Sequence, residues 1–229
     1  IEADVNGNIT GSFTASDAVL SFGYAVNLPW TNFYAGANLK LIHSSIANFS
    51  STGIAGDLGL LYQSPYQPFV FTLVIRNIGT QLKAFDTERE NLPLEIAFGA
   101  SYALQHVPLK WYVTLDNLQQ WKVSVSNPSN LTSDIEGNIT EENISFLNNA
   151  LRHFVIGVEL FPKNAVNLRL GYNFRKSQEL KLQNVRTFGG ISFGFGLKMN
   201  KIKLNYAYSK VHTASNVSTF SLQIDLDSK

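Results

Sequence analysis

The 229-residue chain contains no cysteine, only one methionine and few charged side chains. Without cysteine it has no disulfide, no thiol nucleophile and no thiolate metal site. Charged residues make up 15% of the chain, against roughly 25% in an ordinary soluble domain. Because 18 basic residues nearly balance 17 acidic ones, we expect no nucleic-acid partner, which would require a clustered basic surface.

Long apolar runs and common enzyme motifs are also absent from the sequence. No run approaches the ~18 consecutive apolar residues of a transmembrane helix. The first residues, IEADVNGNIT, lack the basic and apolar regions of a signal peptide. The sequence has no GxGxxG, P-loop, HExxH or GxSxG motif. We therefore expect a protein that is not an enzyme, with no catalytic, cofactor-binding or metal-ligating residues and no cofactor.

The main positive signal is an alternation of apolar and polar residues in segments about ten residues long. Between residues 18 and 28, large apolar side chains take the even positions, and Ser21, Gly23 and Asn27 lie between them. Successive side chains of a strand point to opposite faces, so this pattern predicts one apolar and one polar face. The alternating segments are residues 18–28, 33–42, 54–62, 69–76, 94–105, 109–116, 153–160, 166–175, 191–199, 202–209 and 220–226.

These segments, about eleven in number, have the length that a tilted strand needs to cross a bilayer, whereas soluble sheets usually have strands of about 5–6 residues. Their polar face is rich in Gly, Ser and Asn, which suits a watery or plugged lumen. Because lipid offers no hydrogen-bond partners, a spanning sheet must close on itself. We predict an all-β, antiparallel transmembrane barrel that forms a single domain over residues 1–229.

The expected strand number is odd, although bacterial single-chain barrels have an even number. Either one segment is missed or split, or N-terminal strands of the barrel are missing from this chain, and we favour the second explanation. Two polar stretches interrupt the alternation, Lys83–Asn91 and Asn127–Asn149, and the second includes a predicted short helix at Glu141–Leu151. Long connections are expected on the extracellular side of such a barrel.

The titratable residues form no evident catalytic or metal-binding pattern. Glu95 and Glu159 both fall on the polar face and could form a carboxylate pair. We favour a structural role for them, in which they offset the basic residues Arg76, Arg169, Arg175 and Lys198. The histidines are far apart in sequence and lack metal-ligand spacing, so a structural or lumen-lining role is expected for His43, His106, His153 and His212.

Aromatic and glycine residues fit the same architecture. The run Gly189–Gly196 alternates with aromatics and is predicted to be a strand in which neighbouring backbones approach closely. No helix follows it, so this glycine run is not expected to bind phosphate. Aromatic girdles at the membrane interfaces could use Trp30, Trp111, Trp121, Tyr24, Tyr62, Tyr102 and Tyr172.

Several sequence stretches, in their order and spacing, resemble the PorQ family of type IX secretion system proteins. The opening ADVNGNITGSFTASD is followed by ANLKLIHSSI, VIRNIGTQLK, NLPLEIAFGASYAL and WYVTLDNLQQW. The second half continues with RHFVIGVELF, NLRLGYNFRKSQEL, GGISFGFGLK and FSLQIDL. The resemblance covers essentially the whole chain, although related PorV-like and FadL-like barrels share the NIG and GYN elements.

This resemblance implies an outer-membrane barrel of Bacteroidota that is built like the fatty-acid transporter FadL. It implies about fourteen strands in the full protein, of which about eleven lie in this chain. Proteins of the PorQ family are linked to a cell-surface attachment complex with PorZ, PorU and PorV. PorQ is thought to tether PorZ there, while the PorU sortase joins secreted cargo to lipopolysaccharide. The resemblance carries over no catalytic residue and no partner-contact residue.

The leading hypothesis is therefore a scaffold in the outer membrane that anchors a PorZ-like surface protein of the attachment complex. Its partners would be outer-membrane lipid, the PorZ-like protein and the PorU/PorV sortase complex. The alternative is a FadL-like channel for hydrophobic compounds, which would need an apolar cavity inside the barrel. A third reading, a soluble all-β binding protein, is disfavoured by the length of the strands.

Overall fold

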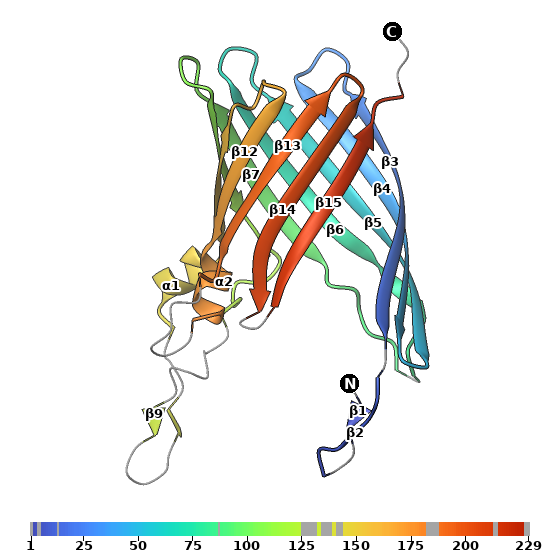
Figure 1. The fold of residues 1–229 in the computed structure, drawn as a ribbon. Coiled ribbons are helices and arrows are strands. Elements are labelled where there is room, and N and C mark those ends of the chain that lie inside the picture. The colour runs from blue at the N-terminus through green and yellow to red at the C-terminus, as the bar shows by residue number, and fades with distance from the viewer. Residues whose placement is uncertain are drawn as a thin grey trace. The chain divides into compact units, whose positions relative to one another are not determined.

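The computed structural model describes residues 2–3, 6–12, 14–86, 88–124, 132–133, 139–140, 144–181, 188–212 and 215–226. Its main element is an antiparallel sheet of eleven strands, in which every strand pairs with its neighbours along the chain (Figure 1). The strands are β3 (Ala15–Asn27), β4 (Phe33–Ile46), β5 (Phe49–Gln63), β6 (Phe69–Lys83), β7 (Glu95–Ala103), β8 (Leu109–Leu115), β11 (Phe154–Leu160), β12 (Val166–Asn173), β13 (Ile191–Met199), β14 (Ile202–His212) and β15 (Ser215–Ile224).

Four short strands and two short helices complete the described secondary structure. The strands form two small hairpins, β1 (Glu2–Ala3) with β2 (Ile9–Gly11) and β9 (Thr132–Ser133) with β10 (Ile139–Thr140). The helices are α1 (Phe146–Leu151) and α2 (Phe174–Glu179). No helix among the residues described here is long and apolar enough to cross a membrane. The predicted all-β, antiparallel class and its eleven alternating segments are confirmed.

The chain divides into two compact units. Unit 1 comprises Ile1–Tyr62 and Leu73–Ile96, and unit 2 comprises Gln63–Thr72 and Ala97–Lys229. The division passes through strands β6 and β7 and not through a linker. The expectation of one domain over residues 1–229 stays a prediction.

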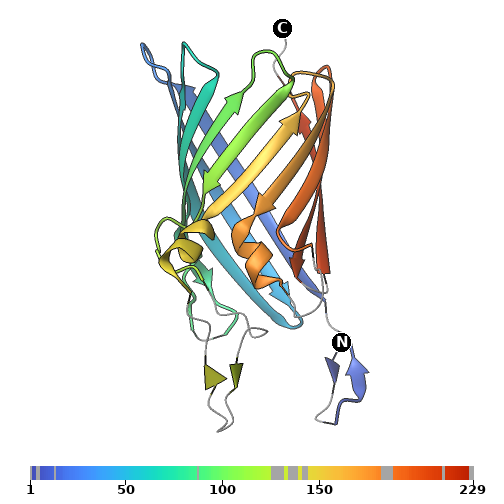
Figure 2. The same ribbon diagram turned by 90° about the vertical axis from the view of Figure 1, so that its left-hand side faces the viewer.

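Short turns join the strands at one end of each unit. In unit 1, the turn between β3 and β4 is held by Thr31, whose hydroxyl donates to the Leu28 carbonyl at 2.9 Å. In unit 2, residues 161–165 join β11 to β12, and residues 200–201 join β13 to β14. The long connections of unit 2 leave from the opposite strand ends, where α1 and α2 lie close together (Figures 1 and 2).

The two faces of the sheet differ as the alternation predicts. In β5, the polar-face residues Ser51, Gly53 and Ala55 are buried, whereas Leu58 on the other face is 52% exposed. Large apolar side chains are exposed in the same way along most strands, including Leu39, Phe71, Leu170, Phe193 and Leu204. Among the described residues, the buried apolar side chains are only Ala55, Ala97, Val123 and Leu180. The described residues therefore leave their apolar face exposed and build no conventional hydrophobic core.

The structure corrects two predicted boundaries near the helices. The helix expected at Glu141–Leu151 begins at Phe146, because the Ser145 hydroxyl caps it by accepting from the Asn148 amide at 3.3 Å; residues 141–143 lie outside the described residues. The strand expected to reach residue 175 ends at Asn173. The Asn173 side chain accepts from the Lys176 amide at 2.9 Å and starts α2, as expected of an asparagine N-cap.

Two further differences concern glycine and a strand irregularity. Gly189 and Gly190 lie in a turn, with Gly190 at φ +81°, and β13 starts only at Ile191. The close backbone approach predicted for this run is confirmed at Gly194, where a Cβ would lie 2.5 Å from the Tyr206 carbonyl oxygen. Strand β6 extends to Lys83, well beyond residue 76, and Asn77 within it has a positive φ of 60°.

Gly79 gives a direct test of the close packing in unit 1. A Cβ at Gly79 would overlap the backbone carbonyl of Ile54, whereas a Cβ at Gly59 has nothing within 4 Å. We expect Gly79→Ala to lower the free energy of unfolding by about 1–3 kcal/mol, the usual cost of overpacking. Gly59→Ala should change it little. Urea unfolding of both variants in lipid vesicles measures the difference, and equal stabilities would contradict the described packing.

Candidate functional site

The polar face of unit 2 carries a row of charged side chains on neighbouring strands. Strand pairing places Lys110, Glu159 and Arg169 side by side on β8, β11 and β12. The same row continues across Gly194 on β13 and Ala207 on β14. Since alternate residues of a strand share a face, all five positions lie on the polar side of the sheet.

Glu159 is the centre of this row. The residue is buried, with 7% of its surface exposed. One carboxylate oxygen accepts from the Tyr112 hydroxyl at 2.5 Å, and the other accepts from Arg169 Nε at 3.2 Å. Lys110 Nζ lies 4.9 Å from the centre of the Tyr112 ring. A buried carboxylate that is paired and hydrogen-bonded in this way holds neighbouring strands together.

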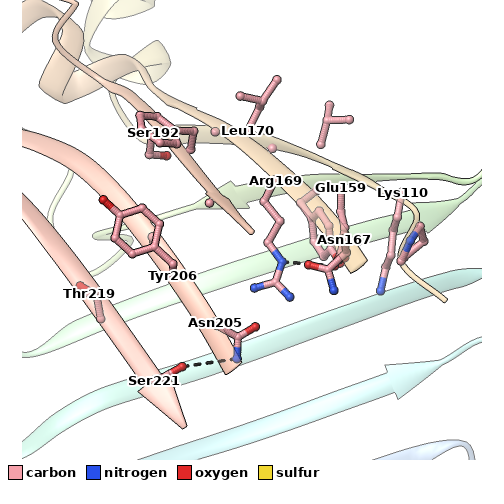
Figure 3. Close-up of a pocket in the computed structure, with 18 of the residues that line it drawn as sticks. Lys110, Glu159, Asn167, Arg169, Leu170, Ser192, Asn205, Tyr206, Thr219 and Ser221 are labelled. Atoms are coloured by element: carbon pink, nitrogen blue, oxygen red, sulfur yellow. Dashed lines mark hydrogen bonds and ion pairs between the residues drawn. The ribbon is translucent and has the colours of Figure 1, made fainter. Parts of the chain in front are cut away.

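Beside this row lies a pocket of about 670 Å³, shown in Figure 3. It is lined by residues of β8, β11, β12, β13, β14 and β15, and its space comes from positions without large side chains, including Gly157, Gly171 and Gly194. Asn167 and Asn205 lie on either side of Gly196 in the strand register. Neither amide oxygen has a hydrogen-bond partner, although both atoms are buried.

Unit 1 has its own polar cluster at the irregularity of β6. Lys40 Nζ lies 2.7 Å from Asp57 Oδ1 and also donates to Asn77 Oδ1 at 2.9 Å. The Asp57 carboxylate accepts further bonds from Asn38 Nδ2 at 3.1 Å and from the Asn77 backbone amide at 3.0 Å. These bonds connect β4, β5 and β6 and fix the local backbone at the irregularity.

The two glutamates singled out from the sequence do not form a pair. Glu95 belongs to unit 1 and accepts from Arg76 at 2.8 Å, while Glu159 belongs to unit 2 and is bound by Arg169. Each glutamate thus pairs with one of the basic residues that it was expected to offset. Of the other basic residues expected to be neutralised, Arg175 approaches Glu179 at 3.8 Å. Lys198 forms no ion pair with any residue that the structure describes.

His153 takes a structural position. Its ring is buried, its Nδ1 lies 2.7 Å from the Asp116 carbonyl oxygen, and its Nε2 lies 3.1 Å from the Trp121 carbonyl oxygen. The ring also stacks on Trp121, with centroids 5.6 Å apart. His43 is exposed beside Thr52. In the described part of the chain, no group of three or more His, Asp and Glu residues could hold a metal ion.

The two expected loops differ in how much the structure describes. Lys83–Asn91 does connect β6 to β7, and its ends are tied by a bridge from Thr80 to Asn91 and by a bond from the Glu90 amide to Gln81 Oε1. Of Asn127–Asn149, residues 127–131, 134–138 and 141–143 lie outside the described residues.

The base of the second loop is fixed by a residue that the sequence analysis did not identify. Asn149 is buried, donates to the Trp121 carbonyl at 2.5 Å and accepts from the Ser124 amide at 3.3 Å. The stretch is rich in asparagine, and the local sequence does not distinguish Asn149 from the neighbouring asparagines. Sequence alone therefore could not identify it as the buried one.

His153 therefore gives a test of how the loop base is held. We expect His153→Phe to keep the stacking on Trp121 but to remove the polar contacts of the ring with the carbonyls of Asp116 and Trp121, at a cost of about 1–3 kcal/mol. Backbone amides of residues 117–123 should exchange with deuterium about tenfold faster or more. His43→Phe is the matched control, and no change should be seen there. Unchanged exchange in His153→Phe would show that the ring does not hold the loop.

Comparison with known proteins gives no neighbour that assigns this site. No family model matches the chain, and no curated protein or solved structure is similar enough to count as a match.

Proposed function

We propose that this chain belongs to an outer-membrane β-barrel of a Bacteroidota type IX secretion system and anchors a PorZ-like surface protein. The observation that carries the membrane part of the proposal is the exposed apolar face of long antiparallel strands. Four consecutive strands, β3 to β6, have 13 to 15 residues each, more than the ~9–11 residues that cross a bilayer when tilted. In water, an apolar surface of this extent would drive aggregation.

The opposite face supports the same assignment. It carries Glu159 with Arg169 in unit 2 and Lys40 with Asp57 in unit 1. Charged pairs of this kind suit the interior of an outer-membrane barrel, which is polar, and not its lipid-facing side. In hydrocarbon every backbone group must be paired, so the sheet would close with further pairing at the outer strands β3 and β15. The PorQ resemblance supplies a closed, FadL-like barrel of about fourteen strands.

The connections give the proposed orientation. In outer-membrane barrels the turns on the periplasmic side are short and the loops on the extracellular side are longer. The short turns of unit 2, such as residues 200–201, would then face the periplasm, and α1 and α2 would lie on the cell-surface side. Lys83–Asn91 and Asn127–Asn149 are accordingly the loops proposed to contact the surface protein and the PorU/PorV complex.

The alternative, a channel for hydrophobic compounds, has weaker support. The pocket on the polar face is lined by Lys110, Glu159, Arg169 and Lys203, which would disfavour an aliphatic ligand. An apolar pocket of about 290 Å³ exists beside Leu168 and Phe195, but these residues belong to the outward apolar face. Lipid contact accounts for that pocket without a transport role.

The membrane assignment predicts that the two faces respond differently to charge. Leu58→Arg places a cation on the apolar face near the middle of β5 and should destabilise the protein in lipid vesicles by about 2–4 kcal/mol. Gly59→Arg, one residue away on the polar face, enters open space and should cost much less. Urea unfolding in vesicles measures both variants. Equal costs at the two positions would contradict lipid contact at Leu58.

The anchoring role is tested by a pull-down of the full-length protein, solubilised with detergent from Bacteroidota cells that produce it. In one variant a Gly/Ser segment replaces residues 127–143 and leaves α1 and Asn149 in place. This variant should lose the PorZ-like protein, because the proposed contact is removed while the loop base stays anchored. The control variant replaces Gln105 and His106 in the short turn at the opposite end with glycine. Recovery of the same partner by both variants would exclude the loop as the contact.

A further inference from the structure

The polar face of unit 2 contains a second row of charged side chains beside the row of Glu159. Lys198 on β13 and Lys203 on β14 are directly opposed in the strand register. Like charges directly opposite on one face of a sheet are destabilising. Neither lysine forms an ion pair with a residue that the structure describes. The neighbouring row, with Lys110, Glu159 and Arg169, alternates in sign and contains the ion pair of Glu159 with Arg169.

Gly196 is the position around which these cations are arranged. Arg169 and Lys203 are its diagonal neighbours on β12 and β14, and Lys198 follows two residues later on its own strand. Diagonal neighbours lie about 7–8 Å apart at the backbone, well within reach of Arg and Lys side chains. Arg169 uses Nε on Glu159, and Figure 3 shows its two terminal nitrogens directed away from Glu159.

Asn167 and Asn205 complete the surroundings of Gly196. A Cβ at Gly196 would lie 2.7 Å from Asn167 Oδ1 and 3.0 Å from Asn205 Oδ1, so both amides lean over the glycine. Asn167 is 4% exposed, and neither amide oxygen has a donor. Unpartnered buried polar atoms are rare in native structures and indicate a missing partner. A partner with both hydroxyl donors and anionic oxygens would satisfy the amides and the cations together.

The space for such a partner is present. The pocket of about 670 Å³ includes Asn167, Arg169, Lys203 and Asn205 among its lining residues. A second pocket of about 600 Å³ adjoins it at Lys203 and is lined by Lys198, Lys201 and Asp225.

We propose that Arg169, Lys198 and Lys203, with Asn167 and Asn205, form a binding site for a phosphate group above Gly196. A protonated phosphate has P–OH groups that donate to the amide oxygens and charged oxygens that accept from the three cations. The side chains supply the binding, so no glycine loop at a helix N-terminus is needed. The site lies on the polar face and does not depend on the proposed surface partner.

Isothermal titration of the full chain with inorganic phosphate, in a phosphorus-free maltoside detergent, tests this site. Saturable binding is expected, and Lys203→Gln should weaken it about tenfold, because one charge-assisted hydrogen bond is lost. Lys210→Gln on the same strand lies outside both pockets and should leave it unchanged. Absence of saturable binding of both inorganic phosphate and short-chain phosphatidic acid, or an equal loss in the two variants, would overturn the proposal.

Two further measurements separate the site from a structural role and identify the source of the phosphate. Without phosphate, Lys203→Gln should unfold at the same temperature as the parent or higher, because it relieves the repulsion from Lys198; with phosphate, only the parent and Lys210→Gln should gain stability. If short-chain phosphatidic acid binds and inorganic phosphate does not, the phosphate belongs to a lipid headgroup. Binding of inorganic phosphate assigns it to a soluble compound. If Lys203→Gln melts lower without phosphate, the lysine has a structural role and the proposal fails.

Discussion

Pairing of the backbone between strands that follow one another in the chain is the constraint on which this structure depends. Each strand of the eleven-stranded sheet lies beside its sequence neighbours, so the backbone N–H and C=O groups find partners locally. With the pairing fixed, alternation decides which side chain faces which way. Leu58 is exposed and Ala55 is buried, in agreement with their opposite faces. A sheet arranged in this way can meet hydrocarbon without leaving its inner strands unpaired.

The polar face then has to accommodate charge in a restricted space, and it does so with small residues. A Cβ at Gly171 would meet the Ser192 hydroxyl, and a Cβ at Gly194 would meet the backbone of Tyr206. The side chains of Asn167 and Asn205 converge over Gly196. A valine at these positions would suit β-propensity better, but it would fill the room that the polar contacts occupy.

Much of the sheet could be predicted from sequence, because a period-2 pattern needs no knowledge of distant residues. The ion pairs of Glu95 and Glu159 also followed from charge balance on a shared face. Features set by register could not be predicted. Sequence alone does not show that Lys198 opposes Lys203 or that Asn167 and Asn205 flank one glycine. The start of α2 at Phe174 was missed because the capping asparagine, Asn173, continued the alternating pattern.

The contrast between two rows of charge shows where function should be sought on this face. Lys110, Glu159 and Arg169 alternate in sign, bury a carboxylate and join three strands, which is sufficient as a structural role. Lys198 and Lys203 face each other across two strands, and neither forms an ion pair with a residue that the structure describes. Local arrangements that work against stability are expected at functional sites, because there the compensating interaction comes from a ligand. The opposed lysines, and not the buried ion pair, are therefore the residues of the polar face that stability alone does not explain.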